Sequence, residues 1–379
     1  AVYLSGLSQA WLAVGLTIGA WCNWKFVAPR LRSYTEVAGD AVTVPVFLSN
    51  RLHDTKRVLR IVSGVVILVF FTFYVSSGMV SGGLFFKSSF GQEYHTGMLL
   101  LAGITVFYTF FGGFMGASYT DMVQGLLMLA ALIAVPVVTI INLGGVAPAD
   151  AKSGRRIGIS WMVLTVFGAL SGAFMGIAYF ARHPEASLTN PETAESVFLD
   201  LSQILFHPLV AGLILAAVLA AIMSTLSSQL IVCSSALVED LYGIFSSKKL
   251  SASKSLWLGR AGVAIVALVA GALAWNPNSS ILQLVAFAWA GFGSAFGPTV
   301  LLSLYWRKLT TQGALASMIT GAVVAFAWGQ SPMKSVLYEM VPGFASALLV
   351  AIIVSLVTYK KNQVIDEEFD RAVELAKVK

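Results

Sequence analysis

The stretch "LVAGLILAAVLAAIMSTLSSQLIVCSSA", residues 209 to 236, contains no charged side chain. A helix that crosses a bilayer needs about 20 largely apolar residues, and this stretch is longer than that. Its second half nevertheless carries six hydroxyl groups and one amide. The hydroxyls nearest the middle belong to Ser224, Thr225, Ser227 and Ser228. The stretch therefore predicts a membrane-spanning helix with oxygen atoms concentrated in one region.

The composition of the whole chain is that of a membrane protein. Of 379 residues, 57% are hydrophobic and 11% are charged, and the mean hydropathy is +0.82. Soluble domains carry about 25% charged residues, so we expect a polytopic membrane protein surrounded by lipid. The formal charge of +6 does not call for nucleic acid, because basic residues in cytoplasmic loops give the same sum.

Further apolar stretches predict an all-α fold with about ten membrane-spanning helices. They lie near residues 1–24, 61–86, 96–116, 121–146, 157–180, 209–236, 257–275, 281–305, 311–329 and 336–358. The charged tail "KKNQVIDEEFDRAVELAKVK" is expected to form a short surface helix. Because the chain starts without a Met and inside an apolar run, we expect a preceding portion to be absent from it.

Basic residues set the predicted orientation. The segment 25–60 contains seven Lys and Arg side chains, so the positive-inside rule places it in the cytoplasm. Alternation of the spans then holds until "KSGRR" at residues 152–156, which would fall outside together with every later basic loop. One additional span between about Ala147 and Lys152 would restore the rule and a cytoplasmic C-terminus. The alternative is a natural ten-helix chain that breaks the rule.

The hydroxyl groups of the opening stretch converge on one face of the predicted helix. A helix turns about 100° per residue. On that spacing one stripe holds Ala221, Ser224, Thr225 and Ser228, with Ser227 beside it. Single Ser and Thr residues in membrane helices usually bond the backbone or a neighbouring helix, and this explanation stays open. A group of them also suits a hard cation, which oxygen atoms bind, so we predict a cation site here.

Asp121, in "GGFMGASYTDMVQGLLMLAAL", is an acidic residue placed to balance a cation. It follows a short turn predicted at 117–120 and precedes an apolar stretch. As a helix N-cap it would accept hydrogen bonds from backbone amides. As an acid close to the membrane it would be a functional residue. Both roles stay open at this point.

Two other segments contain groups that suit either packing or a pocket. Tyr74, in "FFTFYVSSGMVSGG", places a phenol in the middle of a span. It would line a pocket or bond a carbonyl within the packed core. The segment 287–308, "FAWAGFGSAFGPTVLLSLYWRK", is rich in Gly and aromatic residues, which permits close helix packing or a local break.

These patterns favour some function classes over others. A channel would use the same oxygen atoms for conduction, but one crowded stripe without a repeated ring favours a site that encloses its ion. No H-E-x-x-H or G-x-S-x-G pattern occurs, so an enzyme is not expected and no catalytic residue is assigned. A membrane sensor built on a transporter fold is a further alternative.

Long motifs along the chain resemble a known family. They include "GGFMGASYTDMVQGLLMLAALIAVPV", "AAIMSTLSSQLIVCSSALVEDLYG" and "VAFAWAGFGSAFGPTVLLSLYWRKLTTQGALASMITGA". These motifs resemble the sodium:solute symporter family, and most closely its sodium/proline symporters. The resemblance implies an inverted-repeat core of two five-helix halves that works by alternating access. It also implies that sodium entry drives uptake of proline, with pantothenate, a sialic acid or a short carboxylate as alternatives.

The resemblance implies roles for individual residues. Ala221, Ser224 and Thr225 match the family's common sodium site, whereas Asp121, Ser227 and Ser228 match a second sodium site of some members. Tyr74 matches a substrate-side aromatic residue, and Leu282 matches a gating position. Typical proline carriers have Cys at the position of Ser228, so the number of coupled ions stays open.

The resemblance finally implies the extent and location of the protein. Residues 1–379 would form a single transporter domain in the plasma (inner) membrane. Two helices before Ala1 and one after Ala147 would be absent, in agreement with the charge pattern. Sodium is the expected cofactor, and the sequence does not determine the oligomeric state.

Overall fold

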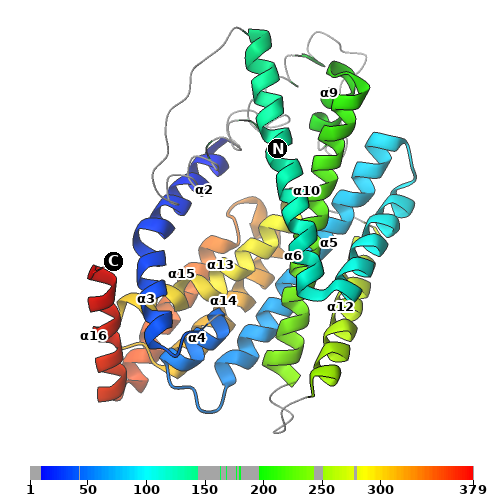
Figure 1. Ribbon diagram of the computed structural model, residues 1–379. Helices are drawn as coiled ribbons and strands as arrows, with labels where there is room; N and C mark the ends of the chain where they lie inside the picture. Colours follow the sequence, from blue (N-terminus) through cyan, green and yellow to red (C-terminus); the bar gives the residue numbers. More distant parts are fainter. Residues whose placement is uncertain are drawn as a thin grey trace. The chain divides into compact units, whose positions relative to one another are not determined.

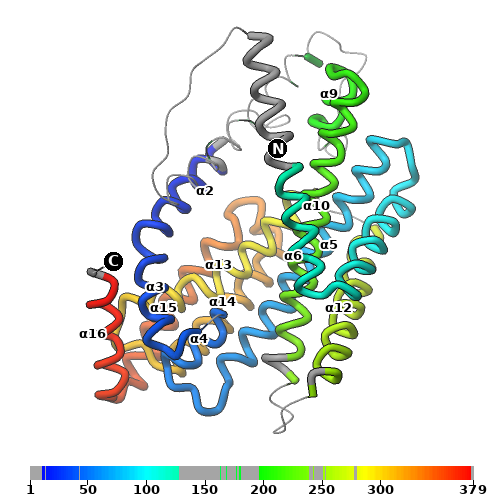
Figure 2. Tube along the Cα trace, in the orientation of Figure 1, coloured from blue at the N-terminus to red at the C-terminus, as the bar shows by residue number. Residues whose placement is uncertain are grey.

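The computed structural model describes residues 10–41, 43–143, 196–242, 251–276 and 280–378, with a few single residues between 163 and 180. Figure 1 shows these residues in colour, and Figure 2 traces the path of the same chain as a tube. Every regular element within them is a helix, so the predicted all-α class is confirmed. The predicted span at 157–180 and the predicted gap near Ala147 lie outside the continuously described ranges.

The chain divides into two compact units, each of which is described by itself. Unit 1 comprises Ala1–Cys22, Ser76–Ser228 and Gly271–Leu282. Unit 2 comprises Asn23–Val75, Gln229–Ala270 and Gln283–Lys379. Several long helices run from one unit into the other. Whether they together form the single transporter domain expected from the sequence stays a prediction.

Within the described residues, seven helices are long and apolar enough to cross a membrane. They are Val58–Phe90, Tyr94–Leu127, Pro208–Val238, Ser253–Ala274, Ile281–Tyr305, Thr311–Gly329 and Met340–Thr358. Each overlaps a predicted span, and the predicted bounds 281–305 and 311–329 agree with the structure. The apolar length of each stretch therefore decides where these helices begin and end.

The elements of the chain follow one another as helices of very different length. The short ones are α2 (Ala10–Cys22), α3 (Ala28–Val37), α4 (Val44–Arg51) and α9 (Val197–Leu205). The long ones are α5 (Val58–Phe90), α6 (Tyr94–Leu143), α10 (Pro208–Ser235), α12 (Ala252–Ala274), α13 (Ile281–Tyr305), α14 (Thr311–Gly329) and α15 (Met340–Thr358), followed by α16 (Gln363–Val378). Only α2 represents the predicted first span, because residues 1–9 are not described.

The predicted turn between the spans 96–116 and 121–146 lies at a different place from the one expected. Residues 117–120 are helical, and the break in α6 occurs at Gly113, where φ is 52° and ψ is −147°. Figure 1 shows α6 changing direction along its length. Only glycine adopts such a backbone conformation at little cost, which explains why the chain breaks at the Gly112–Gly113 pair.

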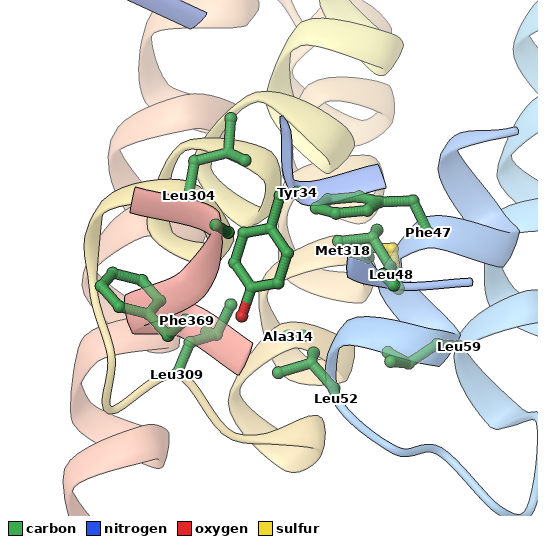
Figure 3. Packing of buried hydrophobic residues seen from close by; sticks show 12 residues of the cluster. Tyr34, Phe47, Leu48, Leu52, Leu59, Leu304, Leu309, Ala314, Met318 and Phe369 are labelled. Atoms are coloured by element: carbon green, nitrogen blue, oxygen red, sulfur yellow. The ribbon is translucent and has the colours of Figure 1, made fainter. Parts of the chain in front are cut away.

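A buried aromatic cluster in unit 2 attaches the C-terminal helix. Figure 3 shows Tyr34 of α3 between Phe47 of α4 and Phe369 of α16. The guanidinium of Arg51 lies 4.9 Å from the centre of the Tyr34 ring, and its Nε donates to the Ser303 carbonyl over 3.3 Å. A positive charge at the C-terminal end of α13 interacts favourably with the helix dipole. The expected helix in the tail is confirmed, and its apolar face is packed on α3.

Close packing among α13, α14 and α15 depends on glycine. Figure 1 shows α14 and α15 side by side, and contacts between them confirm it. A Cβ atom on Gly321 of α14 would overlap the backbone carbonyl of Ser294 in α13. A Cβ on Gly343 of α15 would overlap the Ser294 side chain. Small residues thus allow these backbones to approach each other.

We expect Gly321→Ala to destabilise the protein by about 1 to 3 kcal/mol, because the new methyl group meets backbone that cannot rotate away. Gly212→Ala is the matched control, since a Cβ there meets nothing within 4 Å. The thermal melting midpoint of the purified protein in detergent measures both changes. A midpoint that falls for Gly321→Ala and not for Gly212→Ala supports this packing. Equal midpoints for the two variants would contradict it.

Candidate functional site

The hydroxyl groups predicted to form a site lie on α10, in the part that belongs to unit 1. Ser227 is fully buried, whereas Thr225 and Ser228 are exposed. Ala221 and Ser224 are half-buried. The oxygen-bearing stripe therefore lies at the edge of the packed interior of unit 1, with Ser227 as its buried member.

Asp121 of α6 accepts a hydrogen bond from one of these hydroxyls and lies close to a second. Ser228 Oγ donates to Asp121 Oδ2 over 3.1 Å, and Ser227 Oγ lies 3.5 Å from Asp121 Oδ1. The structure thus brings together the three residues that the resemblance assigned to a second sodium site. Asp121 lies more than a hundred positions before the two serines in the sequence.

The capping role considered for Asp121 is wrong. The residues from 117 to 120 are helical, and the break at Gly113 lies two helical turns earlier. Asp121 is therefore inside a helix, where the backbone amides of its own turn already have partners. Its carboxylate instead faces the serine hydroxyls of α10.

The residues matching the common sodium site form their own hydrogen bonds along α10. Thr225 Oγ1 donates to the Ala221 carbonyl over 2.9 Å. Ser227 Oγ donates to the Ser224 carbonyl over 3.0 Å. These are the backbone bonds common to Ser and Thr in helices. A hydroxyl that donates keeps its oxygen lone pairs, so Thr225 retains the capacity to bind a cation.

Sequence reasoning missed Tyr108, which lies on the arm of α6 before the break. Its hydroxyl donates to the Met223 carbonyl of α10 over 3.1 Å. The same hydroxyl lies beside the side chain of Gln124, which comes from the other arm of α6. In the sequence, the helical spacing of Thr105, Tyr108 and Thr109 indicates a polar face on α6. This spacing alone does not show which helix the face contacts.

The two remaining predicted residues are Tyr74 and Leu282, and the structure describes the local surroundings of each. Tyr74 belongs to unit 2, where its ring stacks on Phe71 with centroids 6.3 Å apart. Phe71 in turn contacts Phe292, with centroids 4.4 Å apart. Leu282 is half-buried at the start of α13. Their substrate-side and gating roles stay predictions.

The arrangement around Asp121 has the chemistry of a site for a hard monovalent cation. One carboxylate supplies a single negative charge, and two hydroxyls supply neutral oxygen ligands. An ionised acid within a membrane-spanning helix is costly, and a bound cation offsets its charge. Among the residues that the structure describes, no three His, Cys, Asp or Glu side chains gather as a transition-metal ligand set would.

Comparison with known proteins identifies the family. The profile described as "Sodium:solute symporter family" matches residues 1–153 and 148–321. The high-affinity proline transporter PutP of Bacillus subtilis (strain 168) is 45% identical over 420 residues, covering 98% of this chain and 88% of that protein. The sodium/proline symporter of Escherichia coli (strain K12) is 43% identical over 422 residues, covering 98% and 84%.

A solved structure shows the same fold. It is the substrate-bound, outward-open state of a sodium-coupled sialic acid symporter. The TM-score is 0.61 at 16% sequence identity, with 96% of this chain and 93% of that chain covered. Because the family profile matches most of the chain and relatives at 43% and 45% identity cover nearly all of it, the chain belongs to the sodium:solute symporter family.

Proposed function

We propose that this protein couples inward movement of sodium to uptake of L-proline by alternating access. The observation that carries the proposal is its similarity, at 41% to 45% identity over nearly the whole chain, to proteins named proline transporters or sodium/proline symporters. The sialic acid symporter shares only the fold, so it does not favour sialic acid as the substrate. Pantothenate, a short carboxylate or a sensory role are favoured by no particular residue.

Sodium would bind at two places on α10. The first set comprises the Ala221 carbonyl with the hydroxyls of Ser224 and Thr225. The second comprises Asp121 with Ser227 and Ser228, and its hydrogen-bonded geometry supports it most directly. Tyr74 would line the proline site, and Leu282 would act in gating.

Sodium would drive transport by binding one conformation better than the other. A ligand shifts a conformational equilibrium only by its difference in affinity for the two states. Each positive charge that crosses 100 mV supplies about 2.3 kcal/mol. That corresponds to about a forty-fold concentration ratio of the solute per ion. The number of coupled ions therefore decides how steeply proline accumulates.

The charge pattern supports an orientation in the plasma (inner) membrane with segment 25–60 and the C-terminus in the cytoplasm. We propose that an additional span belongs between about Ala147 and Lys152. Two observations support it: the alignment with PutP runs over 420 positions, more than this chain contains, and the family match restarts at residue 148.

Uptake of labelled proline into vesicles containing the purified protein tests the function. We expect accumulation when the outside solution contains sodium, and little when potassium replaces it, because the driving ion is then missing. Excess unlabelled proline should suppress the signal more than pantothenate or a sialic acid. Equal uptake in the two salts would refute sodium coupling.

Asp121→Asn should raise the sodium concentration for half-maximal uptake about tenfold or more, because the amide lacks the charge that binds the cation. Asp200→Asn is the matched control. The Asp200 carboxylate also accepts two serine hydroxyls, from Ser196 over 2.7 Å and Ser88 over 3.3 Å. It should leave the sodium dependence unchanged. A similar shift in both variants would show a general structural effect.

Thr225→Ala should weaken the apparent sodium affinity, whereas Thr225→Ser should largely retain it, because only the second variant keeps a hydroxyl oxygen. The comparison is made by uptake at graded sodium concentrations, normalised to the amount of protein in the vesicles. If both variants behave like the parent protein, Thr225 is not a sodium ligand.

A further inference from the structure

Tyr108 links the two helices that carry the proposed sodium ligands. Its hydroxyl donates to the Met223 carbonyl over 3.1 Å, and Met223 lies one helical turn before Ser227. Asp121 reaches α10 from the arm of α6 that follows Gly113, whereas Tyr108 reaches it from the preceding arm. Both arms of α6 therefore contact the same turn of α10.

The hydrogen-bonding capacity of the phenol determines how its neighbours are arranged. A tyrosine hydroxyl has one hydrogen to donate, and Tyr108 gives it to Met223. Toward the side chain of Gln124 the phenol oxygen can then only accept. Gln124 must therefore present its amide NH₂ group to Tyr108, because its carbonyl oxygen cannot donate.

The amide oxygen of Gln124 is left available by this arrangement. Gln124 Oε1 is buried, and it accepts no hydrogen bond in the part of the chain that the structure describes. A buried acceptor without a donor is destabilising and uncommon, so such an atom calls for an explanation. Gln124 follows Asp121 by three positions, which places the two side chains on one face of α6.

We propose that Gln124 Oε1 is an additional ligand of the cation bound by Asp121, Ser227 and Ser228, and that Tyr108 is the positioning residue that orients it. Amide oxygens are ligands that hard cations accept. Groups that hold a metal ligand in place affect affinity although they do not touch the ion. This inference rests on the proposed sodium site and adds two residues to it.

A purely structural role for Tyr108 makes a different prediction. If the phenol only joined α6 to α10, its loss would lower stability without changing sodium affinity. Tyr94 provides the comparison within unit 1, because its hydroxyl also donates to a carbonyl of another helix, that of Ala274, over 2.8 Å. Tyr94→Phe therefore removes a similar bond away from Asp121.

The experiment measures sodium dependence for Tyr108→Phe, Gln124→Met and the double variant, with Tyr94→Phe as control. Uptake is recorded at graded sodium concentrations with saturating proline. Each single variant should raise the half-saturating sodium concentration about tenfold, and the KM for proline at saturating sodium should stay within about twofold. The double variant should be no worse than Gln124→Met, because Tyr108 acts through Gln124.

Additive effects in the double variant, or a shift of the same size in Tyr94→Phe, would overturn the inference. So would unchanged sodium affinity in Gln124→Met. If the parent protein depends on sodium and Asp121→Asn alone shifts that dependence, this inference fails while the proposed function stands. If the parent protein does not depend on sodium, both fail.

A second measurement covers variants that transport too slowly to follow. Sodium that binds the folded protein raises its melting midpoint, and tighter binding raises it more. At a given sodium concentration the midpoint should therefore rise more for the parent protein and Tyr94→Phe than for Tyr108→Phe and Gln124→Met. Equal sodium-induced shifts in all four proteins would contradict the proposal.

Discussion

The carboxylate of Asp121, placed against the hydroxyls of Ser227 and Ser228, is the constraint on which the account of this protein depends. A single acid on a membrane-spanning helix is costly unless its charge is balanced. The Ser228 hydroxyl that donates to it stabilises it only in part, because a hydroxyl carries no charge. In the proposed site a monovalent cation would complete the balance, and its binding or release would change the energy of the contact between α6 and α10. Ion binding would thereby be coupled to helix position.

The local fold of unit 1 makes this contact possible. The break at Gly113 divides α6 into two arms, and side chains from both arms reach one turn of α10. Had α6 been straight, Tyr108 and Asp121 would lie about 20 Å apart along its axis, at 1.5 Å per residue. A glycine with positive φ therefore serves the site as well as the fold.

Much of the fold could be predicted from the sequence, because apolar length alone defines a spanning helix. The bounds of α13 and α14 are examples. The sequence predicts the break in α6 at the wrong place, because the polar residues 117–120 resemble a turn more than the Gly112–Gly113 pair does. Helical spacing predicts which hydroxyls share one face of α10. Which of these hydroxyls is buried depends on the neighbouring helices, and the sequence of α10 does not show it. A helix that is apolar all round has no polar face to mark its exposed side. The sequence therefore does not distinguish the buried Ser227 from the exposed Thr225, and it does not indicate Tyr108.

The most direct test is equilibrium binding of radioactive sodium to the purified protein without any solute. It measures the ion itself rather than transport. The account predicts that the parent protein binds one sodium ion more per chain than Asp121→Asn does, at concentrations where potassium does not compete. The same number of bound ions in both proteins, with the same affinity, would contradict it.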